Sequence, residues 1–121
     1  MSRIAYVNGK YVTHLMAGVH IEDRGYQFAD GVYEVIAVRG GQLVDLDPHF
    51  DRLERSLEAL KIAQPISRGA LAVVVRETVR RNLVRDGIVY MQITRGTAPR
   101  SHPFPSDVDP AVVVTARPMA P

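Results

Sequence analysis

The stretch DPHFDRLERSLEALKIAQPISRGALAVVVRETVRRNL, residues 47–83, is the part of the chain in which apolar residues recur with helical periodicity. Asp47 and Pro48 form a favourable helix start, because aspartate caps free N–H groups and proline fits the first helical position. One apolar stripe follows, at Phe50, Leu53, Leu57 and Leu60. The sequence therefore predicts a first helix that begins at residues 47–48.

A second helix is predicted in the same stretch. Ser67 is a suitable cap, and apolar residues then recur every four positions, at Leu71, Val75, Val79 and Leu83. Charged residues occupy the other side, at Glu77, Arg80 and Arg81. The valines at 73–75 lower helix propensity, but the apolar stripe outweighs them.

Strand patterns precede the two helices. The segments Ile4–Val7 and Lys10–Val12 are joined by Asn8-Gly9, which tolerates the positive φ of a two-residue hairpin turn. Val32–Arg39 is a further strand, which Gly40-Gly41 turns into Gln42–Asp45. The first third of the chain is therefore expected to form an antiparallel meander.

Strand patterns return after the helices. Gly87–Arg95 and the apolar run Ala111–Ala116 are predicted strands, and the proline-rich loop Gly96–Pro110 joins them. Because strands, two helices and strands follow in that order, we expect an α+β fold with two helices packed on an antiparallel sheet. The ending Arg117–Pro121 is typical of a linker to a further domain.

Length and composition fit a single domain over residues 1–121. The chain has 46% hydrophobic and 23% charged residues, so it can bury a core, and disordered and fibrous classes are excluded. No apolar run reaches the roughly 20 residues of a membrane span, and no secretory leader is visible, so we expect a cytoplasmic protein. Cysteine is absent, which excludes disulfides and thiolate ligands.

The charged residues favour small anions as ligands. Lys10 and Lys61 are the only lysines, so 15 − 2 = 13 of the basic residues are arginines, scattered among thirteen acids. No basic face or aromatic ladder suggests nucleic-acid binding, and the four histidines lack the spacing of metal ligands. Arginine prefers planar anions such as carboxylate and phosphate.

Arg52 is the first candidate for an anion site. Nearby Arg55 has Asp51 and Glu58 within one helical turn, so surface ion pairs can satisfy it. Arg52 has no acidic residue three or four positions away, and it lies on the flank of the apolar stripe. Its charge must meet either a distant carboxylate or a bound anion, and the pattern leaves both open.

Two further segments concentrate polar groups. In TRGTAPRSHPFP, residues 94–105, Arg100 and His102 project to the same side of an extended loop and either bind an anion or are solvated. In EDRGYQFADGVYE, residues 22–34, three acids surround Arg24, which indicates either an internally paired turn or part of a site. Tyr33, at the start of the predicted strand, is either packed or functional.

Together with LDPHFDRLERSLEAL, residues 46–60, these two segments resemble the N-terminal domain of the D-amino acid aminotransferases (D-alanine transaminases). That family belongs to the fold-type IV class of pyridoxal-phosphate enzymes, with branched-chain aminotransferases and aminodeoxychorismate lyase. The three motifs cover essentially the whole chain in matching order. The resemblance implies a homodimer that uses pyridoxal 5'-phosphate to move an amino group from a D-amino acid to a 2-oxo acid.

The resemblance also implies roles for four residues. Arg52, in HFDRL, matches the arginine that holds the cofactor phosphate. Tyr33, in DGVYE, matches a tyrosine that helps to bind the substrate carboxylate. Arg100 and His102, in PRSH, match the pair that completes the carboxylate site, which in the family's dimer reaches into the partner subunit. The PRSH element favours D-amino acid enzymes over their branched-chain and lyase relatives.

The sequence departs from the family at two points. The family's lysine that binds pyridoxal phosphate covalently lies in a C-terminal domain, and neither Lys10 nor Lys61 is in a matching context. We therefore expect only the first domain here, inactive alone. Ala29 stands where relatives often carry glycine, which is tolerable unless the backbone needs a positive φ.

Two alternatives to a D-amino acid aminotransferase stay open. One is a branched-chain aminotransferase or an aminodeoxychorismate lyase of the same class. The other, which applies if 121 residues is the natural length, is a non-catalytic dimer that binds an anion through Arg52 or Arg100.

Overall fold

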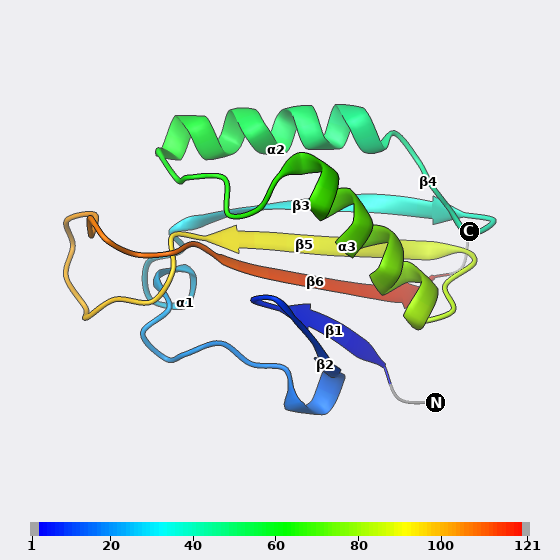
Figure 1. Cartoon of the computed structure of the whole chain (residues 1–121), viewed down its shortest axis with the longest axis horizontal. Helices are drawn as coiled ribbons and strands as arrows, with labels where there is room; N and C mark the ends of the chain where they lie inside the picture. The colour runs from blue at the N-terminus through cyan, green and yellow to red at the C-terminus, as the bar shows by residue number, and fades with distance from the viewer. Residues whose placement is uncertain (1–2, 120–121) are drawn as a thin grey trace.

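A six-stranded antiparallel sheet, in the order β2-β1-β6-β5-β3-β4, runs through the computed structural model, which describes residues 3–119 (Figure 1). The strands are β1 (Ile4–Val7), β2 (Lys10–Thr13), β3 (Gly31–Arg39), β4 (Gln42–Leu43), β5 (Gly87–Thr94) and β6 (Ala111–Pro118). The helices are the 3-10 turn η1 (His14–Met16), α1 (Arg24–Phe28), α2 (Leu46–Leu60) and α3 (Arg68–Arg81). The predicted α+β class is therefore confirmed.

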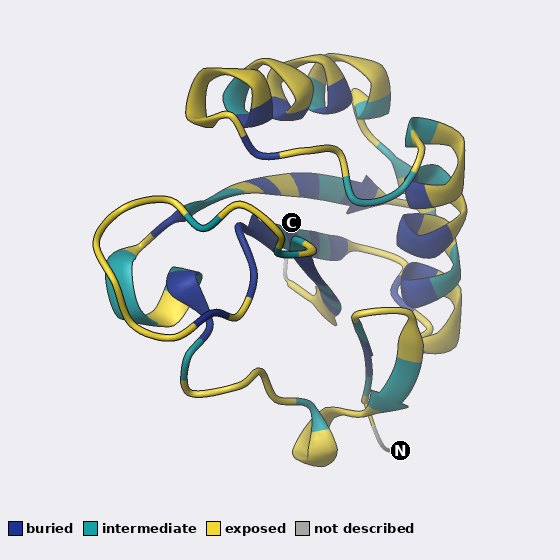
Figure 2. Cartoon of the chain, turned by 60° about the vertical axis from the view of Figure 1, so that its left-hand side comes forward, coloured by how far each residue is buried: buried dark blue, intermediate teal, exposed yellow. Residues whose placement is uncertain are grey.

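The core lies between one face of the sheet and the helices α2 and α3, which both cover that face in Figure 1. Alternate residues of the central strands point into it, as the pleat of a strand requires. Its largest fully buried side chains include Phe50 and Leu53 of α2, Leu71 of α3, and Ile36 and Met91 of the sheet. Blue segments in Figure 2 mark this buried side of both helices. The described residues contain no helix long and apolar enough to cross a bilayer.

Local signals predicted the turns and one helix cap correctly. Asn8 and Gly9 have φ values of 47° and 95°, as a tight hairpin turn needs. Ser67 caps α3, because its side chain accepts a hydrogen bond from the N–H of Ala70 at 3.1 Å. The hairpin, the long strand β3 and both predicted helices are all present. The meander predicted for the first third of the chain is wrong, because β6 and β5 lie between the β1–β2 pair and the β3–β4 pair in the sheet.

The start of α2 was predicted wrongly. The helix begins at Leu46, so its N-cap is Asp45, which makes no side-chain capping bond and has a left-handed φ of 57°. Asp47 and Pro48 lie inside the first turn instead. The physical reason is packing, because the side chain of Leu46 is partly buried against the core and draws the first turn back along the chain.

Helix and strand ends also differ from the predicted pattern. Leu60 is partly exposed at the end of α2, and Leu83 lies beyond α3 with a φ of 53° and an exposure of 65%. The strand predicted at 42–45 ends at Leu43, because β4 pairs with only two residues of β3. Arg117 and Pro118 continue β6 and pair with β5, whereas residues 120–121 of the predicted linker lie outside the described range.

Ala29 does require a positive φ. It is the C-cap of α1, with φ 54° and ψ 31°, and its N–H donates to the carbonyls of Arg24 and Gly25. A left-handed backbone is unfavourable for a residue with a Cβ atom. The alanine is therefore a strained choice at this position.

Candidate functional site

Arg52 projects from the flank of α2 towards β3, where it meets a distant carboxylate. Its Nε and Nη2 donate to the two carboxylate oxygens of Glu34, both at 2.9 Å. His49, one turn earlier on α2, approaches the same carboxylate with Nδ1 at 2.7 Å. Of the two options that the sequence left open for Arg52, the distant carboxylate is present.

The Glu34 carboxylate fixes the charge states around it. Burial raises its pKa, but hydrogen bonds from Arg52 and His49 outweigh burial and hold the pKa below its ordinary value. In turn, the hydrogen bond to Glu34 raises the pKa of Arg52. Because Glu34 is ionised near neutral pH, the Nδ1 of His49 must donate to it. The result is a fixed, permanently charged guanidinium.

Arg52 keeps most of its donors after this pairing. A guanidinium carries five N–H bonds, and the two bonds to Glu34 leave about three of them free for a ligand. The Arg52 side chain is 60% exposed, whereas that of Glu34 is 4% exposed. Arg52 lines a shallow hollow of about 280 Å³ with Asp45, Pro48, His49 and Arg55.

Arg55 does not form the ion pairs that its helical neighbours offered. Among residues 3–119, the salt bridges of Asp51 lead to Arg68 of α3 at 2.7 Å, and none involves Arg55. The contact between helices replaces the one within the helix. Arg55 therefore lines the Arg52 hollow as a second cation, together with the acidic Asp45.

Tyr33 lies on the opposite face of the sheet from the Arg52 hollow. Neighbouring residues of a strand alternate between faces, so Tyr33 points away from α2 where Glu34 points towards it. Tyr33 is 65% exposed, and its ring lies 6.0 Å from that of Tyr90 on β5. Neither the 590 Å³ hollow beside Pro65 nor the 410 Å³ hollow beside Val113 is lined by a predicted site residue.

Arg100 and His102 meet at a single aromatic ring. The Arg100 guanidinium carbon is 5.2 Å from the centroid of Phe28, and the His102 ring centroid is 5.4 Å from it. Both residues are exposed in the loop between β5 and β6. The prediction that they share one side of the loop agrees with this geometry. Within one chain the described contacts do not bring them to Tyr33.

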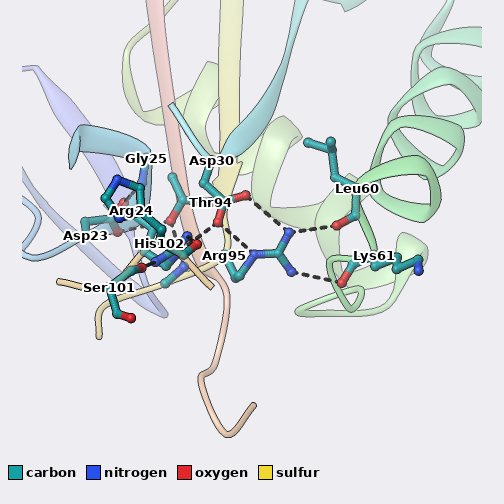
Figure 3. A network of polar contacts seen from close by, with 11 residues as sticks. Asp23, Arg24, Gly25, Asp30, Leu60, Lys61, Thr94, Arg95, Ser101 and His102 are labelled. Atoms are coloured by element: carbon teal, nitrogen blue, oxygen red, sulfur yellow. Dashed lines mark hydrogen bonds and ion pairs between the residues drawn. The ribbon is translucent and has the colours of Figure 1, made fainter. Parts of the chain in front are cut away.

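A buried ionic cluster beside this loop was only partly foreseen. Asp30 accepts from the Nε of Arg24 at 2.8 Å and from the Nε of Arg95 at 2.7 Å, with both bonds ending on Oδ2 (Figure 3). Pairing within residues 22–34 was one of the two predicted options, and it is confirmed for Arg24 and Asp30. Arg95 lies outside that segment, and no local spacing signals its part.

The cluster joins three parts of the chain. Arg95 donates to the carbonyls of Leu60 and Lys61 at the end of α2, at 2.7 and 3.0 Å. Arg24 donates to the carbonyls of Ser101 and His102 in the loop, at 2.6 and 3.3 Å. Figure 3 shows the two guanidinium groups on either side of Asp30. Hydrogen bonds from both arginines outweigh the effect of burial, which raises the pKa of Asp30, and hold that pKa below its ordinary value.

Comparison with known proteins places this geometry in a family. The model of the amino-transferase class IV family matches residues 31–121. The chain is 38% identical over 113 residues to a D-alanine aminotransferase of Staphylococcus haemolyticus and 42% identical over 112 residues to one of Bacillus licheniformis. Each match covers 93% of this chain and 40% of the relative, so the chain spans about two fifths of the length of these relatives.

Solved structures show the same architecture. A branched-chain amino acid aminotransferase of Escherichia coli superposes with a TM-score of 0.90 at 20% identity, over 98% of this chain and 40% of that one. A 4-amino-4-deoxychorismate lyase of Pseudomonas aeruginosa superposes with a TM-score of 0.78 at 28% identity, over 94% of this chain and 39% of that one. The family match covers most of the chain, including β3, α2 and the loop with Arg100 and His102, and the chain belongs to the amino-transferase class IV family.

Proposed function

We propose that the full-length protein carrying this chain is a pyridoxal-phosphate-dependent aminotransferase that moves an amino group from a D-amino acid, such as D-alanine, to a 2-oxo acid. The observation that carries the proposal is the 38–42% identity to D-alanine aminotransferases along about nine tenths of the chain. The motif PRSH at residues 99–102 supports the choice of a D-amino acid.

Arg52 is the residue of this chain that would hold the cofactor phosphate. The donors present fit that group, because Glu34 fixes the guanidinium while about three N–H bonds remain free for phosphate oxygens. A structure of a related branched-chain aminotransferase contains pyridoxamine 5'-phosphate. When bound, the cofactor supplies an electron sink at the carbon that exchanges the amino group.

The covalent lysine for the cofactor is not supplied by this chain in our proposal. Lys10 is exposed on β2, and Lys61 is the C-cap of α2 with its carbonyl bound to Arg95. Neither lies in the Arg52 hollow. We therefore expect the lysine in a following domain and expect no transaminase activity from residues 1–121 alone.

Tyr33, Arg100 and His102 would bind the substrate carboxylate in a homodimer. A phenol, a guanidinium and an imidazole together give directional donors for a planar carboxylate. Because Tyr33 stands on the open sheet face while Arg100 and His102 gather at Phe28, the three fit one site best when two chains contribute to it. Their role would be to orient the substrate and so select the face that loses its proton.

The test gives the full-length protein pyridoxal phosphate, 2-oxoglutarate as amino acceptor and one amino donor at a time, and it measures the 2-oxo acid formed from that donor: pyruvate from D-alanine, or 4-methyl-2-oxopentanoate from L-leucine. We expect D-alanine turnover, at least tenfold faster than L-leucine turnover, and a large loss in Arg100→Met. Faster turnover of L-leucine, or full activity in Arg100→Met, would instead favour the branched-chain or lyase relatives. No covalent cofactor absorbance and no turnover would favour the non-catalytic anion-binding module.

Arg52→Met and Arg55→Met form a matched pair for the cofactor role. Both residues are exposed on α2 and line the same hollow, but only Arg52 is fixed by Glu34. We expect Arg52→Met to weaken pyridoxal-phosphate binding by at least about tenfold, since charge-assisted hydrogen bonds are worth about 1.5–3 kcal/mol each. Arg55→Met should weaken it far less. Equal effects would contradict the assignment of the phosphate to Arg52.

A further inference from the structure

Arg24 is a buried arginine whose hydrogen bonds reach the backbone of the loop that carries Arg100 and His102. It is 2% exposed, and all three of its nitrogens are engaged. Nε donates to Asp30, while Nη1 and Nη2 donate to the carbonyls of two successive loop residues, Ser101 and His102. A loop at the surface is thus held by a charged group from the interior.

The guanidinium is itself held in place by the cluster. Asp30 fixes the Nε side of Arg24 and is fixed in turn by two bonds from Arg95, at 2.7 and 3.2 Å. Arg95 is anchored to the end of α2. The planar fork of Arg24 therefore faces the loop in one orientation only, which a flexible ammonium could not reproduce.

We call the hydrogen bonds from Arg24 to the carbonyls of Ser101 and His102 the loop clamp. The short helix α1 connects the loop clamp to the sheet. Its cap, Asp23, accepts from the N–H of Gly25 at 2.8 Å and from the hydroxyl of Thr94 at 3.0 Å. Gly25 lies so close to β5 that a Cβ atom there would come within 2.3 Å of the Thr94 methyl group. Because α1 cannot shift away from β5 without breaking these contacts, Arg24 is positioned by the sheet itself.

The same helix supplies the ring on which the loop side chains rest. Arg24 and Phe28 are four residues apart and so share one face of α1. The Arg24 guanidinium carbon lies 4.6 Å from the centroid of Phe28, the ring that Arg100 and His102 also contact. One helix face therefore holds the backbone carbonyls of Ser101 and His102 and also contacts the side chains of Arg100 and His102.

We infer that Arg24 is a positioning residue for the substrate-carboxylate site: it fixes the backbone at Ser101 and His102 so that the side chains of Arg100 and His102 are presented together over Phe28. This inference rests on the proposed function, which assigns Arg100 and His102 to the substrate. Arg24 is 2% exposed and each of its three nitrogens already donates to a protein oxygen, so a substrate cannot reach it and it acts only through the loop.

Arg95 is the matched control. It is also buried and shares Asp30, but its other side-chain hydrogen bonds go to the end of α2. Among the described residues, its guanidinium lies 3.7 Å from the ring of the loop residue Phe104 but donates no hydrogen bond to the loop backbone. Arg24→Lys and Arg95→Lys each keep a positive charge beside Asp30 and lose the two carbonyl bonds. Loss of stability is common to both variants, whereas loss of the loop clamp belongs to Arg24→Lys.

The experiment uses the full-length protein and compares the wild type with Arg24→Lys and Arg95→Lys. It measures KM and kcat for D-alanine, the dissociation constant of pyridoxal phosphate, and hydrogen exchange of the amides of residues 100–102. For Arg24→Lys we expect KM to rise about tenfold, because small displacements of binding groups are costly. The kcat and the cofactor dissociation constant should change less than twofold, and the loop amides should exchange at least tenfold faster. Arg95→Lys should change KM and loop exchange less than twofold.

Equal effects of the two variants, or a parallel loss of cofactor affinity in Arg24→Lys, would show a merely structural role and overturn the inference. Unchanged KM with unchanged exchange in Arg24→Lys would overturn it as well. If the wild type does not turn over D-alanine, the proposed function fails. The hydrogen-exchange data alone then test whether Arg24 holds the loop. Faster exchange in Arg24→Lys than in Arg95→Lys then upholds it, and equal exchange refutes it.

Discussion

Replacing Asp30 with asparagine tests the ionic cluster that joins α2, α1 and the 96–110 loop. The carboxylate accepts three hydrogen bonds, from Arg24 at 2.8 Å and from Arg95 at 2.7 and 3.2 Å, and its side chain is 7% exposed. Asparagine can keep an oxygen at the position where both Nε bonds end. It would place an amide NH₂ group against the remaining guanidinium donor and leave two buried cations without a counter-charge.

The magnitude follows from the burial of the cluster. Removing one partner of a buried ion pair costs about 3–5 kcal/mol, and we take about 3 kcal/mol because the amide oxygen retains two of the three bonds. For a chain of this size each kcal/mol lowers the melting temperature by roughly 4 °C. Asp30→Asn should therefore melt roughly 12 °C below the wild type.

Thermal unfolding followed by circular dichroism measures this shift. Glu77→Gln is the matched control, because Glu77 also lies between two arginines, Arg80 and Arg81, but at the surface of α3. The arginine hydrogen bonds lower the pKa of Glu77 to about 2, yet solvent screens the pair. Glu77→Gln should melt close to the wild type. An Asp30→Asn shift as small as that of Glu77→Gln would refute the buried network as a source of stability.

Three further changes have defined outcomes. Gly25→Ala should destabilise the chain by about 1–3 kcal/mol in urea unfolding, because its Cβ would collide with Thr94. Ala29→Gly should stabilise it by about 0.5–1 kcal/mol, because glycine relieves the left-handed φ of 54°. Asp30 and Glu34 have lowered pKa values in the folded chain, so their contribution to the free energy of unfolding is complete above about pH 5 and is lost as the pH falls below about 4. Glu34→Gln should therefore reduce the loss of stability between about pH 5 and the acid range.

Gly69 and Ala70, both in α3, provide control variants for the glycine and alanine changes. Gly69 meets nothing within 4 Å, so Gly69→Ala should stabilise the first turn of the helix where Gly25→Ala destabilises α1. Ala70→Gly should destabilise α3, because Ala70 is helical, in contrast to Ala29. A loss of stability in Ala29→Gly would contradict the argument that the left-handed φ strains the alanine. If Glu34→Gln loses as much stability at acid pH as the wild type, the argument from the lowered pKa of Glu34 is contradicted.

The fold was predictable where local chemistry decides it. The positive φ values at Asn8 and Gly9 and the cap at Ser67 depend only on neighbours in sequence, and all three were anticipated. The start of α2 was not, because the local preference of Asp47-Pro48 gave way to the burial of Leu46 against residues far along the chain. Tertiary packing overrode a capping preference worth about 1 kcal/mol.

The candidate site was likewise predictable only where neighbours in sequence determine it. The lack of an acidic neighbour on its own helix identified Arg52 from the sequence. Its partner Glu34 lies 18 residues away on a strand, so the sequence could predict only that some distant carboxylate pairs with Arg52. The link from Arg95 to Asp30 spans 65 residues, and no periodicity connects the two. The Arg95–Asp30 contact depends on the register of β3 with β5, and the Arg52–Glu34 contact on the packing of α2 against β3; a single sequence encodes neither locally.

Burial separates the arginines of this chain into different roles, although their chemistry is the same. Arg24 is 2% exposed with all its nitrogens donating to protein oxygens, so it can orient a loop but cannot receive a ligand. Arg52 gives two bonds to Glu34 and keeps its other donors at the surface, so it is both fixed and available. Among residues 3–119 no oxygen accepts from the Arg100 guanidinium, which meets only the ring of Phe28. An arginine on a loop binds a ligand tightly in one orientation only if the loop backbone is already held, because ordering the loop on binding costs affinity. Buried Arg24 holds the backbone next to exposed Arg100 and so reduces that cost.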